Sequence, residues 1–243
     1  MGAIAFGVRN RKEILRDPLS MVFGLGFPVV LILLLTFMKQ SIPGMSEIFA
    51  IENFAPGMAV FGLSFIALFT GMLIAGDRSS SYLMRLFASP LKGSDYIIGY
   101  TYPLLPLAIL QTLVCFATAI LVGLTASINI LFAILALIPV AVLFISIGLL
   151  MGSMLNRNQM NGAGAILTNG SLWLSGILFP LDMISGAFKV VCYSLPFAHA
   201  VDLTKAALSG HYAAILPHLG WVIGYATVIL VIAVILFKGK IKG

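Results

Sequence analysis

Charged residues are scarce in this chain of 243 residues. Asp, Glu, Lys and Arg make up 9% of it, hydrophobic residues make up 60%, and the mean hydropathy is +1.10. Soluble domains carry about 25% charged residues, so this composition excludes a soluble globular enzyme. The polar segments between the apolar stretches are each too short to enclose a core of their own.

Motifs for catalysis and nucleotide binding are missing as well. The chain has no H-E-x-x-H motif, no serine-nucleophile motif and no phosphate-binding loop of the form G-x-x-x-x-G-K-[ST]. His199, His211 and His218 lack tight metal-ligand spacing and are interpreted as surface histidines. Cysteine is also rare, and Cys115, in a predicted span, and Cys192, in a predicted loop, are expected to be free thiols. We therefore expect no catalytic, cofactor or metal site here, and any nucleotide must be bound by another chain.

Long charge-free stretches are what the chain has instead. A bilayer core of roughly 30 Å needs about 20 apolar residues for each helical crossing. Four of the five stretches fit one crossing each, and the third has room for two, with a turn near Gly123 to Asn129. We predict an all-α integral membrane protein with six transmembrane helices. The stretches run from Pro18 to Met38, Asn53 to Gly76, Tyr96 to Asn156, Asn158 to Leu181, and Ala206 to Phe237.

The basic residues set the predicted orientation, because short cytoplasmic loops carry an excess of Lys and Arg. An even number of spans puts both termini on one side, and that side holds eleven basic residues against three on the other. Both termini are therefore predicted to be cytoplasmic. The net charge of +6 is interpreted as topology and contact with anionic headgroups, and not as nucleic-acid binding. The eleven are Arg9, Arg11, Lys12, Arg16, Arg78, Arg85, Lys92, Arg157, Lys238, Lys240 and Lys242, and the three are Lys39, Lys189 and Lys205.

The amino-terminal segment is predicted to form a helix on the inner membrane surface. Arg9, Lys12, Glu13 and Arg16 recur at helical spacing on one face. This helix either anchors the topology or contacts a cytoplasmic partner. The first apolar run follows Asp17 without a cleavage pattern, so it is interpreted as an anchored span. We expect one transmembrane domain over residues 1–243, made of the interfacial helix (1–17), the six-helix bundle (18–238) and a basic cytoplasmic tail (239–243).

Glycines recur at four-residue spacing in two predicted spans. Gly148 with Gly152, and Gly220 with Gly224, have the spacing that lets helix backbones approach closely. Packing within the chain is the preferred interpretation, and a dimer seam is the alternative.

The last external segment, from Ser175 to Gly210, is too apolar for a plain loop. Pro180, Gly186 and Pro196 divide it into pieces of roughly ten residues, which are too short to cross a bilayer. We predict short re-entrant or interfacial helices that cover the outer end of the bundle between spans five and six.

The segment between spans two and three carries the clearest candidate for a partner contact. A short helix is predicted before Pro90, with Leu83, Leu86 and the basic Arg85 held at the inner face of the membrane. A soluble partner protein can bind such a helix. The alternative interpretation is a solvated loop between the two spans.

This segment resembles the membrane subunit of type-two ABC transporters, exporter-type permeases whose ATPase is often a separate polypeptide. In that family an acidic–arginine pair closes span two, a short helix and a proline follow, and a Gly-Lys pair opens span three. This chain has Asp77-Arg78, Leu83 to Phe87, Pro90 and Gly99-Tyr100. Asp77 in place of Glu and Tyr100 in place of Lys are departures from the pattern.

The external segment carries the second part of the resemblance. Ser175-Gly176 through Phe179-Pro180, then Leu195-Pro196, Val201-Asp202 and Gly210, reproduce the family's spacing between spans five and six, and Phe188 stands where an aromatic residue is usual. The resemblance implies that the residues of functional interest in this segment are Gly176, Pro180, Phe188, Pro196 and Asp202.

The resemblance implies the transmembrane half of an ATP-driven exporter in the plasma membrane of a prokaryote. Two such subunits, as a homodimer or a heterodimer, would work with two copies of an ABC ATPase that bind ATP and Mg. The coupling loop would comprise Asp77, Arg78, Leu83, Arg85, Leu86 and Pro90, and we expect Asp77 and Arg85 to hold the loop helix against the ATPase. The amino-terminal helix would be the family's connecting helix.

A charge-free path suits an apolar or amphipathic substrate such as a drug, a lipid or a lipopeptide. Spans two and five at the dimer seam are the candidate path, through Phe61, Phe65, Phe69, Asn169 and Trp173, although aromatic residues at helical spacing are also typical of packing. A non-transporting membrane scaffold or assembly protein, or a permease that works without an ATPase, stays open as an alternative.

Overall fold

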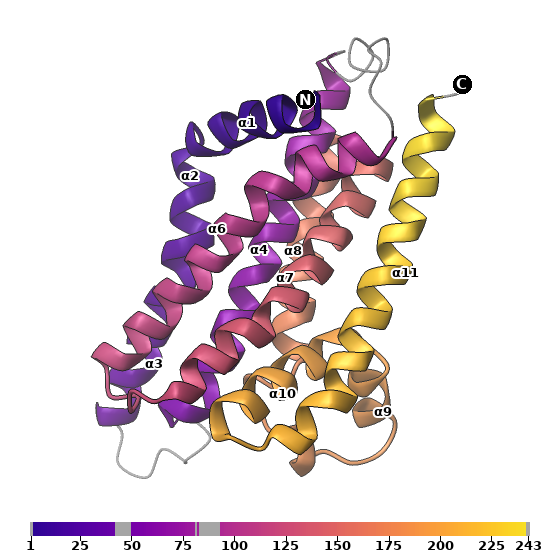
Figure 1. The fold of residues 1–243 in the computed structure, drawn as a ribbon. Helices are drawn as coiled ribbons and strands as arrows, with labels where there is room; N and C mark the ends of the chain where they lie inside the picture. The colour runs from indigo at the N-terminus through magenta and orange to yellow at the C-terminus, as the bar shows by residue number, and fades with distance from the viewer. Residues whose placement is uncertain (1, 42–49, 81, 83–92, 242–243) are drawn as a thin grey trace.

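The chain forms a bundle of α-helices (Figure 1). The computed structural model describes residues 2–41, 50–80, 82 and 93–241, and these ranges contain helices and turns but no β-strand. The prediction of an all-α membrane protein is confirmed. Both termini lie at one end of the bundle, which we call the inner end, and the opposite end, with α9 and α10, is the outer end.

Long helices make up most of the bundle. The first span is a continuous run of α2 (Pro18–Met21), the π-helix η1 (Val22–Gly26) and α3 (Phe27–Ser41). It follows α1 (Gly2–Leu15), which lies across the inner end (Figure 1). The remaining elements are α4 (Ile51–Ser79), α6 (Gly93–Leu121), α7 (Ile128–Met154), α8 (Arg157–Leu174), η3 (Leu181–Met183), α9 (Ala187–Tyr193), α10 (Pro196–Ser209), η4 (Tyr212–Ala214) and α11 (Ile215–Ile241).

Five helices of the described chain are long and apolar enough to cross a membrane. They cover Val22–Ser41, Ile51–Ser79, Asp95–Leu121, Ile128–Met154 and Tyr212–Leu236. The predicted turn between spans three and four is present, with Gly123 at φ 120°. The remaining predicted span, the fifth in chain order, corresponds to α8, whose 18 residues give a length of about 27 Å. It packs along α4 with one face and exposes most of its other residues, and its amino-terminal half is polar.

The boundaries of the external segment agree with the prediction of Ser175 to Gly210. Gly210 adopts φ 77° and ends α10 before α11 begins, so the charge-free stretch from Ala206 to Phe237 is not one helix. Helix α8 ends at Leu174, and Gly176 adopts φ 76° in the turn that follows. In both places a glycine turns the chain inside a segment that has no charge to mark the end.

The core is centred on α4, which packs against α3, α6, α7, α8 and α10. A Cβ atom on Gly148 would lie 2.3 Å from the Ala67 carbonyl oxygen, and one on Gly152 would lie 2.7 Å from that of Gly71. Small residues are therefore required where α7 meets α4, as the spacing predicted. By contrast, Gly220 and Gly224 of α11 have no atom within 4 Å of an added Cβ.

Short helices form the outer end, as predicted. Pro196 occupies the first turn of α10, and Pro180 precedes η3. Phe188 of α9 packs on Phe179, with 6.2 Å between the ring centroids. Asp202 accepts a hydrogen bond of 3.0 Å from the Tyr193 hydroxyl. These contacts tie α9 to the turn before it and to α10.

Two residue environments at the outer end differ from the predictions. Cys192 is a buried residue of α9 and does not lie in a loop, although it is a free thiol as expected. His199 is not a surface histidine, because only 7% of it is exposed. Both lie on faces of α9 and α10 that pack inward, and helix faces of so short a segment cannot be assigned from its uniformly apolar sequence.

Candidate functional site

Asp77, near the end of α4, is held by an ion pair with Arg9 of α1. The Arg9 guanidinium donates through Nη1 to Oδ2 and through Nη2 to Oδ1, each at 2.8 Å. The Asp77 side chain is only 1% exposed, whereas that of Arg9 is 34% exposed. A charge buried to this degree requires a close partner, and the planar guanidinium satisfies both carboxylate oxygens at once.

The same carboxylate also binds α6, so three helices meet at one buried charge. The Tyr100 hydroxyl donates to Asp77 Oδ2 at 2.9 Å. Next to it, Asn10 Nδ2 donates to the Gly99 carbonyl oxygen at 3.1 Å. A Cβ atom on Gly99 would lie 2.1 Å from Phe6, so α1 and α6 touch where Gly99 lacks a side chain. We call Phe6, Arg9, Asn10, Asp77, Gly99 and Tyr100 the inner latch.

The inner latch explains the departure at Tyr100. The family pattern has Lys at this position, which would place a cation beside the acidic residue of span two. Here Arg9 supplies that cation from α1, and a neutral hydroxyl donor completes the carboxylate's hydrogen bonds. Both Arg9 and Tyr100 stood out in the sequence, but no sequence pattern predicted that they lie beside the same carboxylate.

Arg9 also connects the latch to its surroundings. It pairs with Glu13 one turn along α1 at 2.6 Å, and its guanidinium lies 4.2 Å from the ring centroid of Tyr82. The hydrogen bond and charge of Asp77 outweigh the effect of burial and raise the pKa of Arg9. Burial raises the pKa of Glu13, with Arg9 opposing it. The arginine therefore stays charged at any physiological pH, and the latch does not titrate through it.

Arg78 joins a fourth helix to the same region. Its Nη1 donates to the carbonyl oxygens of Gly152, Ser153 and Leu155, at 3.0, 2.8 and 3.2 Å. These are carbonyls at the end of α7, which have no partner within the helix. A cation there also suits the negative end of the helix dipole. Arg78 therefore caps α7.

The predicted coupling residues thus divide into two groups. Asp77 and Arg78 make contacts within the chain, and Asp77 faces α1, so it is buried away from any soluble partner. Leu83, Arg85, Leu86 and Pro90 lie outside the described residues. Tyr82, at the start of that segment, is described and stacks on Phe6, with 6.5 Å between the ring centroids.

The candidate path residues lie on two separate surfaces. Phe61, Phe65 and Phe69 form a row on α4 with neighbouring ring centroids 5.4 and 6.5 Å apart, and Phe27 of the first span packs on the first two. Asn169 and Trp173 lie on an exposed face of α8, where Trp173 is 54% exposed. The row of phenylalanines is largely covered within the chain, while the α8 pair is available for contact.

The fold and the inner latch together define a polytopic helical membrane protein whose amino-terminal helix is bonded to the ends of its spans. The model of the ABC-2 type transporter membrane family matches residues 3–208, from α1 into α10. The chain belongs to this family and is a transporter permease subunit. No curated protein matched the chain in a sequence comparison.

Proposed function

We propose that this permease is the membrane half of an ATP-driven exporter in the plasma membrane of a prokaryote. A separate ABC ATPase, in two copies, would bind ATP and Mg, and a second permease subunit would complete the path. The observation that carries the proposal is the inner latch. It joins α1, α4 and α6 at a buried ion pair, directly beside the segment that the family uses to contact its ATPase.

The latch suggests how movement of an ATPase would reach the spans. A push on residues 83–92 acts on α4 and α6, which that segment connects. Tyr82 passes the same displacement to α1, because it contacts Phe6 and Arg9 of the latch. Arg78 extends the connection to the end of α7. Nucleotide binding then needs only to favour one of two packings of the bundle.

The substrate we propose is apolar or amphipathic. Charged side chains are absent from the central part of the described spans, and the two candidate path surfaces are aromatic or amide in character. A charged substrate would meet no counter-charge there, and desolvation of its charge would be costly.

Co-purification tests the proposal. The tagged full-length protein is extracted in mild detergent, the bound proteins are identified, and ATP hydrolysis by the product is measured. We expect stoichiometric recovery of an ABC ATPase, and its loss when Leu83 and Leu86 are both changed to Asp. Leu121→Asp is the matched control, because Leu121 is 86% exposed at the outer end of α6 and far from the loop. Recovery of the permease alone, without ATPase activity, would contradict the proposal.

A further inference from the structure

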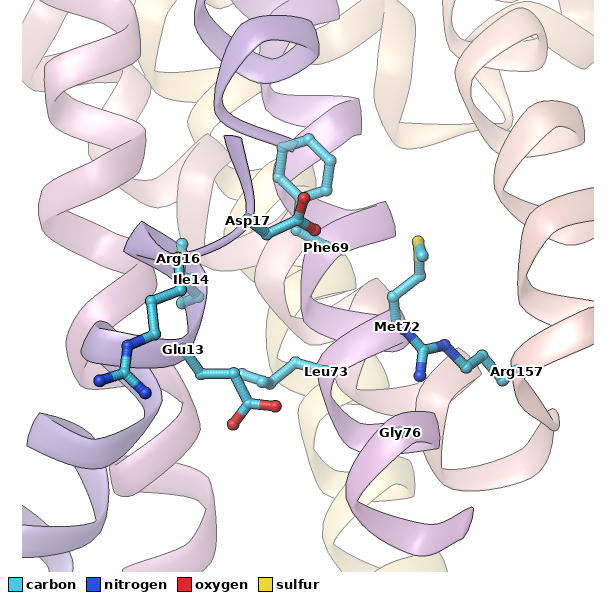
Figure 2. A pocket seen from close by; sticks show the side chains of 9 residues that line it. All are labelled: Glu13, Ile14, Arg16, Asp17, Phe69, Met72, Leu73, Gly76 and Arg157. Carbon is cyan, nitrogen blue, oxygen red and sulfur yellow. The ribbon is translucent and has the colours of Figure 1, made fainter. Parts of the chain in front are cut away.

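The inner end has a cavity of about 280 Å³ between α1, α4 and α8 (Figure 2). Glu13 and Asp17 line it from the amino-terminal segment, and Arg157 lines it from the start of α8. Glu13 pairs with Arg9 at 2.6 Å, and Asp17 has an interaction of its own, so neither carboxylate is left for a ligand. Titratable side chains that the proposed function does not use lie at the other end of the bundle.

A pair of histidines joins α10 to α11 at the outer end. The Nδ1 atoms of His199 and His218 lie 2.9 Å apart, which is hydrogen-bond distance. His199 is 7% exposed and stacks on Trp221 of α11, with 5° between the ring planes. Histidine is the side chain that changes charge near neutral pH. The two helices are therefore joined through groups that titrate.

The neighbour of His199 fixes where the protons of the neutral pair lie. His199 Nε2 is 3.0 Å from the Tyr193 carbonyl oxygen, which can only accept, so this nitrogen carries a proton. Neutral His199 then has a lone pair at Nδ1, and His218 donates to it from its own Nδ1. The next proton that His218 can gain goes to its Nε2, on the side of the ring that does not face His199.

Two protons therefore affect the pair in opposite ways. A first proton on His218 Nε2 leaves the Nδ1–H donor in place and makes the hydrogen bond charge-assisted, which strengthens it. A second proton enters at His199 Nδ1 and occupies the lone pair that accepts. Two charged rings then point N–H groups at each other, and the contact between the helices is lost.

The surroundings of His199 oppose its protonation. Burial lowers the pKa of His199 and has the largest effect; the Tyr193 carbonyl oxygen raises it, His218 lowers it and Asp202 raises it. The helix α7, which packs along α10, carries no charged residue. Titratable groups on the other elements that pack against α10 are Glu52 at the outer end of α4, Arg157 at the inner end of α8, Lys189 of α9, His211 before η4, and Tyr225 of α11.

We propose that the His199–His218 pair is a proton-operated lock, which holds α10 against α11 while one ring is neutral and releases it when both rings are charged. Because α10 also packs against α4 and α7, its release loosens the outer end of the core. The Tyr225 hydroxyl donates to the Ser194 carbonyl oxygen, and this neutral bond keeps α11 beside α9. The use of this loosening in substrate release rests on the function proposed above, whereas the lock rests on the geometry of the pair.

Nitrogen-15 NMR of the purified full-length permease, labelled at its three histidines, tests the lock. Near pH 8 we expect the protons on Nε2 of His199 and on Nδ1 of His218. Acidification should add the first proton at His218 Nε2 and the second at His199. The protection of α10 amides from hydrogen exchange should fall about tenfold at the second step only, the value of one charge-assisted hydrogen bond. A neutral His199 that carries its proton on Nδ1, or a loss of protection at the first step, overturns the proposal.

Two histidine variants sharpen the test. A glutamine amide can donate to neutral His199 and accept from charged His199, so His218→Gln should keep α10 protected in acid. His211→Gln changes the third histidine, which is exposed and lies 3.1 Å from the Ser209 hydroxyl, and should respond as the native protein does. A native-like loss of protection in His218→Gln contradicts the lock, as does a response that a metal chelator removes. Because no ATPase is present, these outcomes are independent of whether export is ATP-driven.

Discussion

The two ends of the bundle are held together by different chemistry. At the inner end a buried carboxylate binds an arginine and a tyrosine, and the contact joins α1, α4 and α6. At the outer end, α10 and α11 meet through a pair of histidines and an aromatic ring. His199 Nδ1 lies 2.9 Å from His218 Nδ1, and His199 stacks on Trp221 with 4.9 Å between the ring centroids.

The contact between α10 and α11 depends on the protonation of its histidines, whereas Arg9 stays charged at the inner end. His199 Nε2 lies 3.0 Å from the Tyr193 carbonyl oxygen, which can only accept, so Nε2 carries the proton. Neutral His199 then accepts at Nδ1 from His218. Protonation of both rings would place two N–H groups against each other. The inner end of this fold is therefore held by charged groups, whereas protonation can weaken the helix contacts at the outer end.

Arg9→Ala should produce the largest effect and break the inner end. It leaves the Asp77 carboxylate buried with the Tyr100 hydroxyl as a donor, and removal of one partner of a buried pair costs about 3–5 kcal/mol. Thermal unfolding of the detergent-solubilised protein measures this loss. Arg11→Ala, an exposed arginine of the same helix, is the control and should change little. A melting temperature for Arg9→Ala equal to that of Arg11→Ala would show that the ion pair does not hold the inner end.

Gly148→Ala should have the next largest effect, by separating α7 from α4 at mid-bundle. The added Cβ would lie 2.3 Å from a backbone oxygen, which cannot rotate away, so we expect a loss of about 1–3 kcal/mol. Gly220→Ala is the matched change on the open face of α11, and it should be neutral or stabilise by up to about 1 kcal/mol through helix propensity. Comparison of the two melting curves checks the prediction, which fails if both variants behave alike.

The same change from tyrosine to phenylalanine at each end sharpens the comparison. Tyr100→Phe removes a donor from a carboxylate that water cannot reach, and should cost about 1.5–3 kcal/mol. Tyr193→Phe removes a donor from Asp202, which is partly exposed and can bind water instead, so the cost should be below about 1 kcal/mol. Denaturation in matched detergent gives both values. Equal costs would mean that burial does not distinguish the two ends.

Acidification should give the smallest effect, confined to the outer end. Burial lowers the pKa of His199; the Tyr193 carbonyl and Asp202 raise it, and His218 lowers it further. Since the folded pKa is depressed, the unfolded chain binds the proton first, so stability is full above about pH 6.5 and falls as the pH drops below it. Hydrogen exchange should therefore quicken in α9 and α10 below about pH 6, but not in α1. The His218→Gln variant should show a weaker pH dependence of exchange. An equal acceleration of hydrogen exchange in α1 would contradict the prediction.

Local patterns in the sequence predicted much of this structure. The spacing of Arg9, Lys12, Glu13 and Arg16 predicted α1, and the spacing of Gly148 predicted the close approach of α7, because helical periodicity is a local property. The motif resemblance also singled out Asp77 before its environment was known. What these signals share is that a few neighbouring residues suffice to produce them.

Pairings between distant residues could not be predicted. Arg9 and Asp77 are separated by 68 positions, and no local signal joins them. The inward-facing positions of Cys192 and His199 were missed because the segment around them is uniformly apolar. The cavity at Arg157 likewise needs three helices to be in place before its charges lie near one another.

The most direct test of this account asks whether α1 moves together with the inner end of α4. Spin labels at Arg11 and Ser79, both exposed, report the distance between these helices in the permease bound to its ATPase. Electron paramagnetic resonance with and without a non-hydrolysable ATP analogue should give one unchanged distance in the native protein, and a broadened one in Arg9→Gln. A second distance that appears in the native protein when nucleotide binds would contradict the inner latch as the element that carries movement from the ATPase to the spans.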